Sequence, residues 1–148
     1  MKQVLVALDF SEVTEEVVER AAVLAESLGA RLWMIHAAAP EPDFVGYDAG
    51  PEGVRDRVAE HLREEHRDLQ ARAETLRERG IDARALLVQG PTVEVILREA
   101  EKLGAELIVL GSHGHGAVFR ALLGSTSEGV LHKAQVPVLI VPAHSGRH

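Results

Sequence analysis

Five short apolar runs, separated by segments with helical spacing, constrain the fold more than any other feature of this sequence. The runs span residues 4–8, 32–37, 83–88, 107–110 and 138–141. Most of them lack strict polar alternation, which is typical of strands covered on both faces. The order β-α-β-α-β-α-β-α-β therefore predicts an α/β fold, an open five-stranded parallel sheet with right-handed crossovers and helices on both faces.

The predicted helices have clear end signals. Gly29, Gly80 and Gly104 each follow the last apolar residue of a helix, and a glycine there can take the left-handed conformation that closes a helix. Pro91 fits the first turn of the third helix, where its missing N–H costs little. The apolar faces expected to be buried are Val13, Val17, Ala21, Leu24 and Leu28; Val54, Val58, Leu62, Leu69, Ala73 and Leu76; and Val93, Ile96, Ala100 and Leu103.

Length and composition exclude several classes of protein. The 148 residues fit a single domain, residues 1–148, and the absence of cysteine excludes disulfides, thiolate metal sites and cysteine nucleophiles. No apolar run approaches the ~18 residues of a spanning helix or has the pattern of a signal peptide, so we expect a cytoplasmic protein without a membrane partner. The net charge of −7, with 16 Lys and Arg interspersed among 23 Asp and Glu, predicts no nucleic-acid partner.

In a doubly wound sheet a ligand binds in the crevice beyond the carboxyl ends of the strands, here residues 9–11, 36–38 and 111–114. Two connections near these strand ends are longer than usual. The first, residues 38–53, is acidic and rich in proline and glycine. It fits either a flexible flap near that crevice or an insertion with no role.

The second long connection reads GSHGHGAVFRALLGSTS, residues 111–127. Its glycines allow backbone N–H groups to approach a ligand, and the helix that follows offers unpaired donors to an anion. Ser125 or Thr126 could instead only cap that helix. Neither a Walker lysine nor a dinucleotide fingerprint is present. Phosphate charge would be met by backbone donors, hydroxyls, His113, Arg120 and a divalent cation such as Mg²⁺.

The glycine spacing carries a specific resemblance. Gly111-x-x-Gly114, nine residues, and then Gly124-Ser125 resembles the ATP-binding signature G-2x-G-9x-G-[ST] of universal stress proteins. The opening VLVALDFS, the segment 107–114 and the closing segment 136–141 resemble the family's first, fourth and last strands. The resemblance implies an adenine nucleotide alpha hydrolase-like, Rossmann-like fold with strand order 3-2-1-4-5.

The resemblance also implies a function and a site. It implies a regulatory stress-response module that binds ATP, ADP or AMP with Mg²⁺ and hydrolyses ATP slowly or not at all. Asp9 resembles the carboxylate that binds the ribose, and Ala37 the residue whose backbone reads adenine. The remaining positions implied to bind nucleotide are Ala7, Leu8, Leu110, Gly111, His113, Gly114, Gly124, Ser125, Thr126 and Ser127. His115 and Gly116 depart from the basic residue and hydroxyl that members often carry there.

Several alternatives stay open. Asp9 could be a loop carboxylate or a helix cap. His36 is interpreted as a structural hydrogen-bonded histidine, and His61 and His66 as solvated. His113 and His115 are interpreted as loop histidines because no third metal ligand is evident. The competing functions are an ATP-using hydrolase or nucleotidyl transferase, and a nucleotide-independent interaction module.

Assembly is predicted from the last strand. Residues Val136–Val141 would form a hydrophobic edge strand, which favours pairing with another chain. The resemblance implies a homodimer formed through this strand. A client protein is expected, and nothing in the sequence identifies it.

Overall fold

The computed structural model describes residues 2–38, 51–112 and 123–142, with the backbone alone for residues 51–56. Nine elements follow one another in these ranges, strand and helix in strict alternation. They are β1 (Gln3–Ala7), α1 (Thr14–Leu28), β2 (Arg31–Ala38), α2 (Pro51–Glu78), β3 (Ala83–Gln89), α3 (Thr92–Leu103), β4 (Leu107–Gly111), α4 (Ser125–Lys133) and β5 (Val138–Val141). The body of the predicted flap, residues 39–50, and the loop with His113 and Gly114 lie outside the described residues.

The predicted sheet is confirmed. Its strands are all parallel and lie in the order β3-β2-β1-β4-β5. In the centre of the sheet Val6 pairs with Met34 of β2 on one side and with Val109 of β4 on the other. The chain winds outward from β1 to β3 and then crosses back to β4, so the strand order reverses between β1 and β4.

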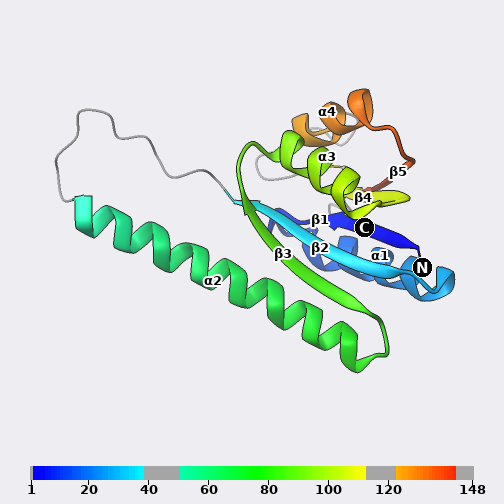
Figure 1. Cartoon of the computed structure of the whole chain (residues 1–148), viewed down its shortest axis with the longest axis horizontal. Coiled ribbons are helices and arrows are strands. Elements are labelled where there is room, and N and C mark those ends of the chain that lie inside the picture. The colour runs from blue at the N-terminus through cyan, green and yellow to red at the C-terminus, as the bar shows by residue number, and fades with distance from the viewer. Residues whose placement is uncertain (1, 39–50, 113–122, 143–148) are drawn as a thin grey trace, which may run out of the picture.

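Helices cover both faces of the sheet (Figure 1), because alternate strand residues point to opposite sides. Val4 and Val6 of β1 pack with α1 and α2, while Leu5 between them packs with α3 and α4. Each face thus has its own aliphatic core, and both cores include residues from the central strands. The carboxyl ends of the strands remain as the edge where a ligand can enter.

The ends of the helices were predicted more accurately from the sequence than the faces that the helices bury. The three glycines predicted to close helices all have positive φ, namely Gly29 at 63°, Gly80 at 88° and Gly104 at 67°. Pro91 is the N-cap of α3 and not a residue of its first turn. Leu28, expected to be buried, is 45% exposed. Val95 and Glu99 of α3 are buried although the predicted face omitted them, so the buried face of α3 includes positions that its apolar spacing did not mark.

Both ends of the segment predicted as a flap, residues 38–53, belong to regular elements. Ala38 is the last residue of β2, where its carbonyl oxygen accepts a hydrogen bond from the N–H of Gly90 at 3.1 Å. Residues 51–53 begin helix α2 because Pro51 suits a first helical position.

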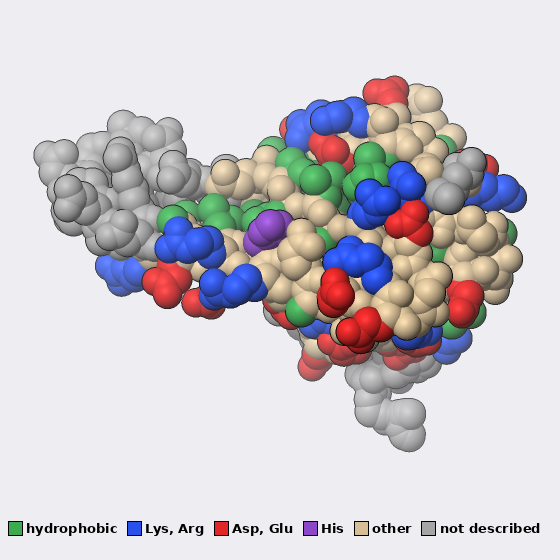
Figure 2. All heavy atoms as spheres, turned by 60° about the horizontal axis from the view of Figure 1, so that its bottom comes forward, with side chains coloured by type: hydrophobic (Ala, Val, Ile, Leu, Met, Phe, Trp, Pro, Cys, Tyr) green, Lys and Arg blue, Asp and Glu red, His purple; other side chains and the backbone are tan. Residues whose placement is uncertain are grey.

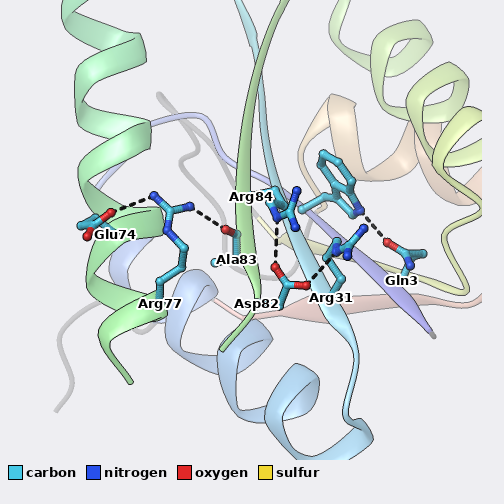
Figure 3. A network of polar contacts seen from close by, with 8 residues as sticks. Gln3, Arg31, Glu74, Arg77, Asp82, Ala83 and Arg84 are labelled. Atoms are coloured by element: carbon cyan, nitrogen blue, oxygen red, sulfur yellow. Dashed lines mark hydrogen bonds and ion pairs between the residues drawn. The ribbon is translucent and has the colours of Figure 1, made fainter. Parts of the chain in front are cut away.

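Polar contacts join the strands at the end of the sheet opposite the carboxyl edge (Figure 3). The carboxylate of Asp82 accepts hydrogen bonds from Nε of Arg31 at 2.9 Å and from Nε of Arg84 at 3.0 Å. These two guanidinium groups hold the pKa of Asp82 below its ordinary value. Arg77 of α2 donates to the carbonyl oxygen of Ala83 at 2.7 Å, which ties the end of α2 to the start of β3.

The surface charges are mixed. Figure 2 shows one face on which Lys and Arg side chains alternate with Asp and Glu. On that face the charges do not form the continuous basic stripe of a duplex-binding domain. Within the described ranges, no helix combines the length and apolar character needed to cross a bilayer.

Candidate functional site

A cavity of about 410 Å³ lies beyond the carboxyl ends of β1, β2 and β4. It is therefore at the place where the strand order reverses, as expected for a ligand site in a doubly wound sheet. Ten of the twelve residues predicted to bind nucleotide line it, and the other two, His113 and Gly114, lie outside the described residues. The ten are Ala7, Leu8, Asp9, Ala37, Leu110, Gly111, Gly124, Ser125, Thr126 and Ser127.

Six further residues line the cavity that were not predicted to bind nucleotide. They are Val13, Thr14, Val17, His36, Thr92 and Ile96. His36 was expected at the crevice, within residues 36–38, but as a structural residue. Thr14 and Thr92 are the first residues of α1 and α3. Adding the first five residues of these two helices to the strand ends would have found Thr14, Val17, Thr92 and Ile96.

The connection between β1 and α1 presents Asp9. Ser11 donates its backbone N–H to Oδ1 of Asp9 at 2.9 Å, an Asx turn within the loop. Helix α1 has Val13 at its N-cap position and no side-chain cap. The alternative that Asp9 caps α1 is therefore wrong. The exposed Asp9 carboxylate lies at the cavity wall, where it can accept hydrogen bonds from hydroxyl groups of a ligand.

The start of α4 forms the opposite end of the cavity. Gly124 is the N-cap and has no side chain to cap the helix, so the expectation that Ser125 or Thr126 serves as the cap is wrong. The first-turn N–H groups consequently have no side-chain partner at the cap, and they carry the partial positive charge of a helix start. This end of the cavity can bind an anion.

Ser127 plays a different role from its two neighbours. It is 3% exposed and donates its hydroxyl hydrogen to the carbonyl oxygen of Gly111 at 2.6 Å. Gly124 donates its N–H to the carbonyl oxygen of Ser112 at 2.7 Å, next to that contact. Of the three hydroxyls at the start of α4, those left for a phosphate are therefore the hydroxyls of Ser125 and Thr126.

His36 lies in the wall of the cavity between the sheet and α2. Its Nδ1 is 2.7 Å from the carbonyl oxygen of Leu8, and its Nε2 is 3.1 Å from Oε2 of Glu65. The ring of Phe10 packs against it, with the ring centres 4.5 Å apart. The interpretation of His36 as a hydrogen-bonded structural histidine is confirmed. On α2, His61 is 3.3 Å from the same Glu65 oxygen and is 69% exposed.

The cavity fits a cation only together with a ligand. Within residues 2–38, 51–112 and 123–142, no three His, Cys, Asp or Glu side chains come together as a metal site. Asp9 is the one carboxylate among the described lining residues. A Mg²⁺ ion here would take its oxygen ligands from phosphate groups and water, with the hydroxyls of Ser125 and Thr126 as further candidates.

Comparison with known proteins agrees with this geometry. Residues 1–142 match the model of the universal stress protein family. A universal stress protein of Thermus aquaticus is 37% identical over 141 residues, which cover 95% of this chain and 98% of that protein. A solved structure from the same family in Burkholderia pseudomallei is 30% identical, with a TM-score of 0.72 and 96% of each chain covered. A further solved universal stress protein, in complex with cAMP, shares the fold at 24% identity with a TM-score of 0.66, covering 95% of this chain and 96% of that one. The chain therefore belongs to the universal stress protein family.

Proposed function

We propose that this protein is an adenine-nucleotide-binding module of the stress response that acts by regulation and turns ATP over slowly or not at all. Universal stress proteins are generally regulatory or binding modules. The observation that carries the proposal is that a carboxylate, the carboxyl end of β2 and the start of α4, which has no side-chain cap, line one ligand-sized cavity. Its volume of about 410 Å³ lies within the range of small-molecule sites.

The three parts of a nucleotide find matching chemistry. Asp9 would accept hydrogen bonds from the ribose hydroxyls. Ala37 leaves room for a flat base, whose edge its backbone can read, and Ile96 offers an apolar contact in the same wall. The start of α4, with Ser125 and Thr126, would bind the phosphates. The solved relative in complex with cAMP supports an adenine nucleotide as the ligand class.

The charge of the site suggests weak discrimination between phosphate chain lengths. The described lining residues include no Lys or Arg, so the phosphates would meet only N–H and hydroxyl donors, with Mg²⁺ to offset the remaining charge. ATP, ADP and AMP are therefore expected to bind with affinities closer to one another than in a P-loop protein, where a lysine contacts the outer phosphates.

The experiment that tests this proposal combines mass spectrometry of small molecules released from freshly purified protein with titration of ATP and Mg²⁺. Two variants address the cavity, Asp9→Ala at the ribose position and Ala37→Phe, which fills the base position. Glu12→Ala is the matched control, because Glu12 is an exposed carboxylate in the same connection that does not line the cavity. Binding by the wild type and by Glu12→Ala, with losses in both cavity variants, supports the proposal.

Two other outcomes would redirect it. If the folded wild type neither releases adenine nucleotide nor binds added ATP, the protein is a nucleotide-independent interaction module. If ATP is turned over rapidly with saturation, the protein is an enzyme on this fold.

We also propose that the protein works in the cytoplasm as a homodimer that contacts a client protein. The support for the dimer is that β5 lies at the edge of the described sheet, beside β4, and that Leu139 on it is 38% exposed. Pairing of two such edges would complete their backbone hydrogen bonds.

A further inference from the structure

His36 joins two segments of the chain that are far apart in sequence. Its imidazole is buried, with the side chain 10% exposed, and its two nitrogens face oxygens of different elements. Nδ1 is 2.7 Å from the Leu8 carbonyl at the end of β1, and Nε2 is 3.1 Å from the Glu65 carboxylate on α2. The Glu65 side chain is itself only 17% exposed. The imidazole is thus a bridge between α2 and the segment that leads to Asp9.

The two contacts use both nitrogens of the imidazole. The carbonyl oxygen of Leu8 can only accept, so Nδ1 donates its hydrogen to it. Nε2 is then the nitrogen that contacts the carboxylate of Glu65. Removing this carboxylate would therefore release one end of the bridge between β1 and α2.

The segment held by this bridge is the one that presents Asp9. Leu8 is held at both backbone groups, because its N–H also donates to the carbonyl oxygen of Ile35 at 2.8 Å. Two residues later, Phe10 has φ of 58°, a left-handed conformation that a bulky side chain rarely adopts. The Phe10 ring packs on the imidazole at 4.5 Å, so His36 contacts this strained residue as well. Asp9 lies between these two anchored positions.

We propose that His36 is a positioning residue of the cavity, which, through its contact with Glu65 of α2, holds the Leu8–Phe10 segment so that Asp9 faces the ligand. This inference rests on the proposed function for its ligand and adds that affinity depends on a residue of α2 that does not itself line the cavity.

Two substitutions at Glu65 separate positioning from simple stability. In Glu65→Gln the side-chain amide can both donate and accept, so it keeps a hydrogen bond to Nε2 of His36. This variant should bind ATP with Mg²⁺ within about twofold of the wild type. In Glu65→Ala the bridge is lost, so the affinity should fall about tenfold.

Two controls address neighbouring groups. Glu64→Ala removes an exposed carboxylate one residue away and should keep the wild-type affinity. His61→Asn removes the second histidine that contacts Glu65 and should also keep it, which assigns the effect to His36. Wild-type affinity in Glu65→Ala, or an equal loss of affinity in His61→Asn, overturns the inference.

A second measurement does not need a ligand. Amide hydrogen exchange of residues 8–11 in the ligand-free protein should be faster in Glu65→Ala than in the wild type and in Glu65→Gln, because only Glu65→Ala loses the bridge. If the wild type binds no adenine nucleotide, the proposed function fails and this comparison alone decides the inference. Equal exchange of residues 8–11 in the three proteins would overturn it even if ATP binds normally.

Discussion

Ser127 donates its hydroxyl hydrogen to the carbonyl oxygen of Gly111 across 2.6 Å, which ties the first turn of α4 to the last residue of β4. Both residues line the cavity, yet the hydroxyl of Ser127 is used within the protein. Its exposed neighbour Ser125 makes no such contact among the described residues. Two serines two positions apart thus have separable roles, one in holding the sheet to the helix and one in facing a ligand.

We expect Ser127→Ala to lower the free energy of unfolding by about 1 kcal/mol, because the hydrogen bond from the buried Ser127 side chain to the carbonyl oxygen of Gly111 is lost. Ser125→Ala should leave stability within about 0.5 kcal/mol of the wild type, as for most exposed positions, and should weaken ATP binding. Urea denaturation and calorimetric titration of both variants check this. Equal losses of stability in the two variants would contradict the assigned roles.

Asp82 gives a prediction about pH. Hydrogen bonds from Arg31 and Arg84 hold its pKa below the ordinary value (Figure 3). The folded state therefore binds fewer protons than the unfolded state, so the stabilisation is complete above the unfolded pKa of about 4 and is lost as pH falls through the lower, folded pKa. Because these side chains are partly exposed, Asp82→Asn should cost only about 0.5 kcal/mol at pH 7.

The difference in unfolding free energy between wild type and Asp82→Asn should stay constant from about pH 7 to 5 and shrink below about pH 4. Denaturation at a series of pH values measures it. Glu101→Gln is the control, since Glu101 makes no ion pair within the part of the chain that the structure describes. A difference that grew on acidification would show that the two arginines do not stabilise the ionised carboxylate.

The strands, the helix ends and most of the cavity could be predicted because their signals are local. Apolar runs mark buried strands, glycines mark helix ends, and a parallel sheet brings the residues after its strands to one edge. Asp9, Ala37 and Gly111 therefore meet although they are far apart in sequence. The predicted end of β1 is one residue late, because Leu8 continues the apolar run but lies just beyond the last residue of the strand, Ala7.

The rest depends on how helices are rotated and where they cross. Thr14 and Thr92 line the cavity through the rotation of α1 and α3, which an apolar stripe does not specify to within one residue. The contact between His36 and Glu65 joins residues 29 apart and requires α2 to cross β2 at one particular point. The apolar face of α2 has a gap between Leu62 and Leu69, and Glu65 lies in this gap. The gap was a visible signal of a polar contact, because a polar residue on a buried face needs a hydrogen-bonding partner.

Gly90 and Gly29 provide a matched pair for backbone strain. Gly29 has φ of 63° with nothing within 4 Å of an added Cβ, whereas Gly90 has φ of 147° and an added Cβ would lie 3.0 Å from Cγ2 of Val95. Asparagine tolerates the first conformation but not the second. We expect Gly29→Asn to cost less than about 1 kcal/mol and Gly90→Asn about 2–3 kcal/mol. Urea denaturation compares them, and similar losses would mean that the β3–α3 connection adapts freely.

Leu139 tests the proposed dimer. It lies on the edge strand β5 and is 38% exposed, and in a dimer joined along this strand it would be covered. Leu139→Lys should therefore give a monomer in light scattering at micromolar concentration, because the charge would be buried against the second copy without a partner. Val23→Lys is the control: Val23 lies on α1 and not on the edge strand, it is 48% exposed, and its substitution should leave the mass unchanged. A Leu139→Lys protein that stays dimeric would place the contact between copies elsewhere. A wild type that is already a monomer would remove the proposed dimer. In that case another part of the same chain must protect the edge strand from pairing.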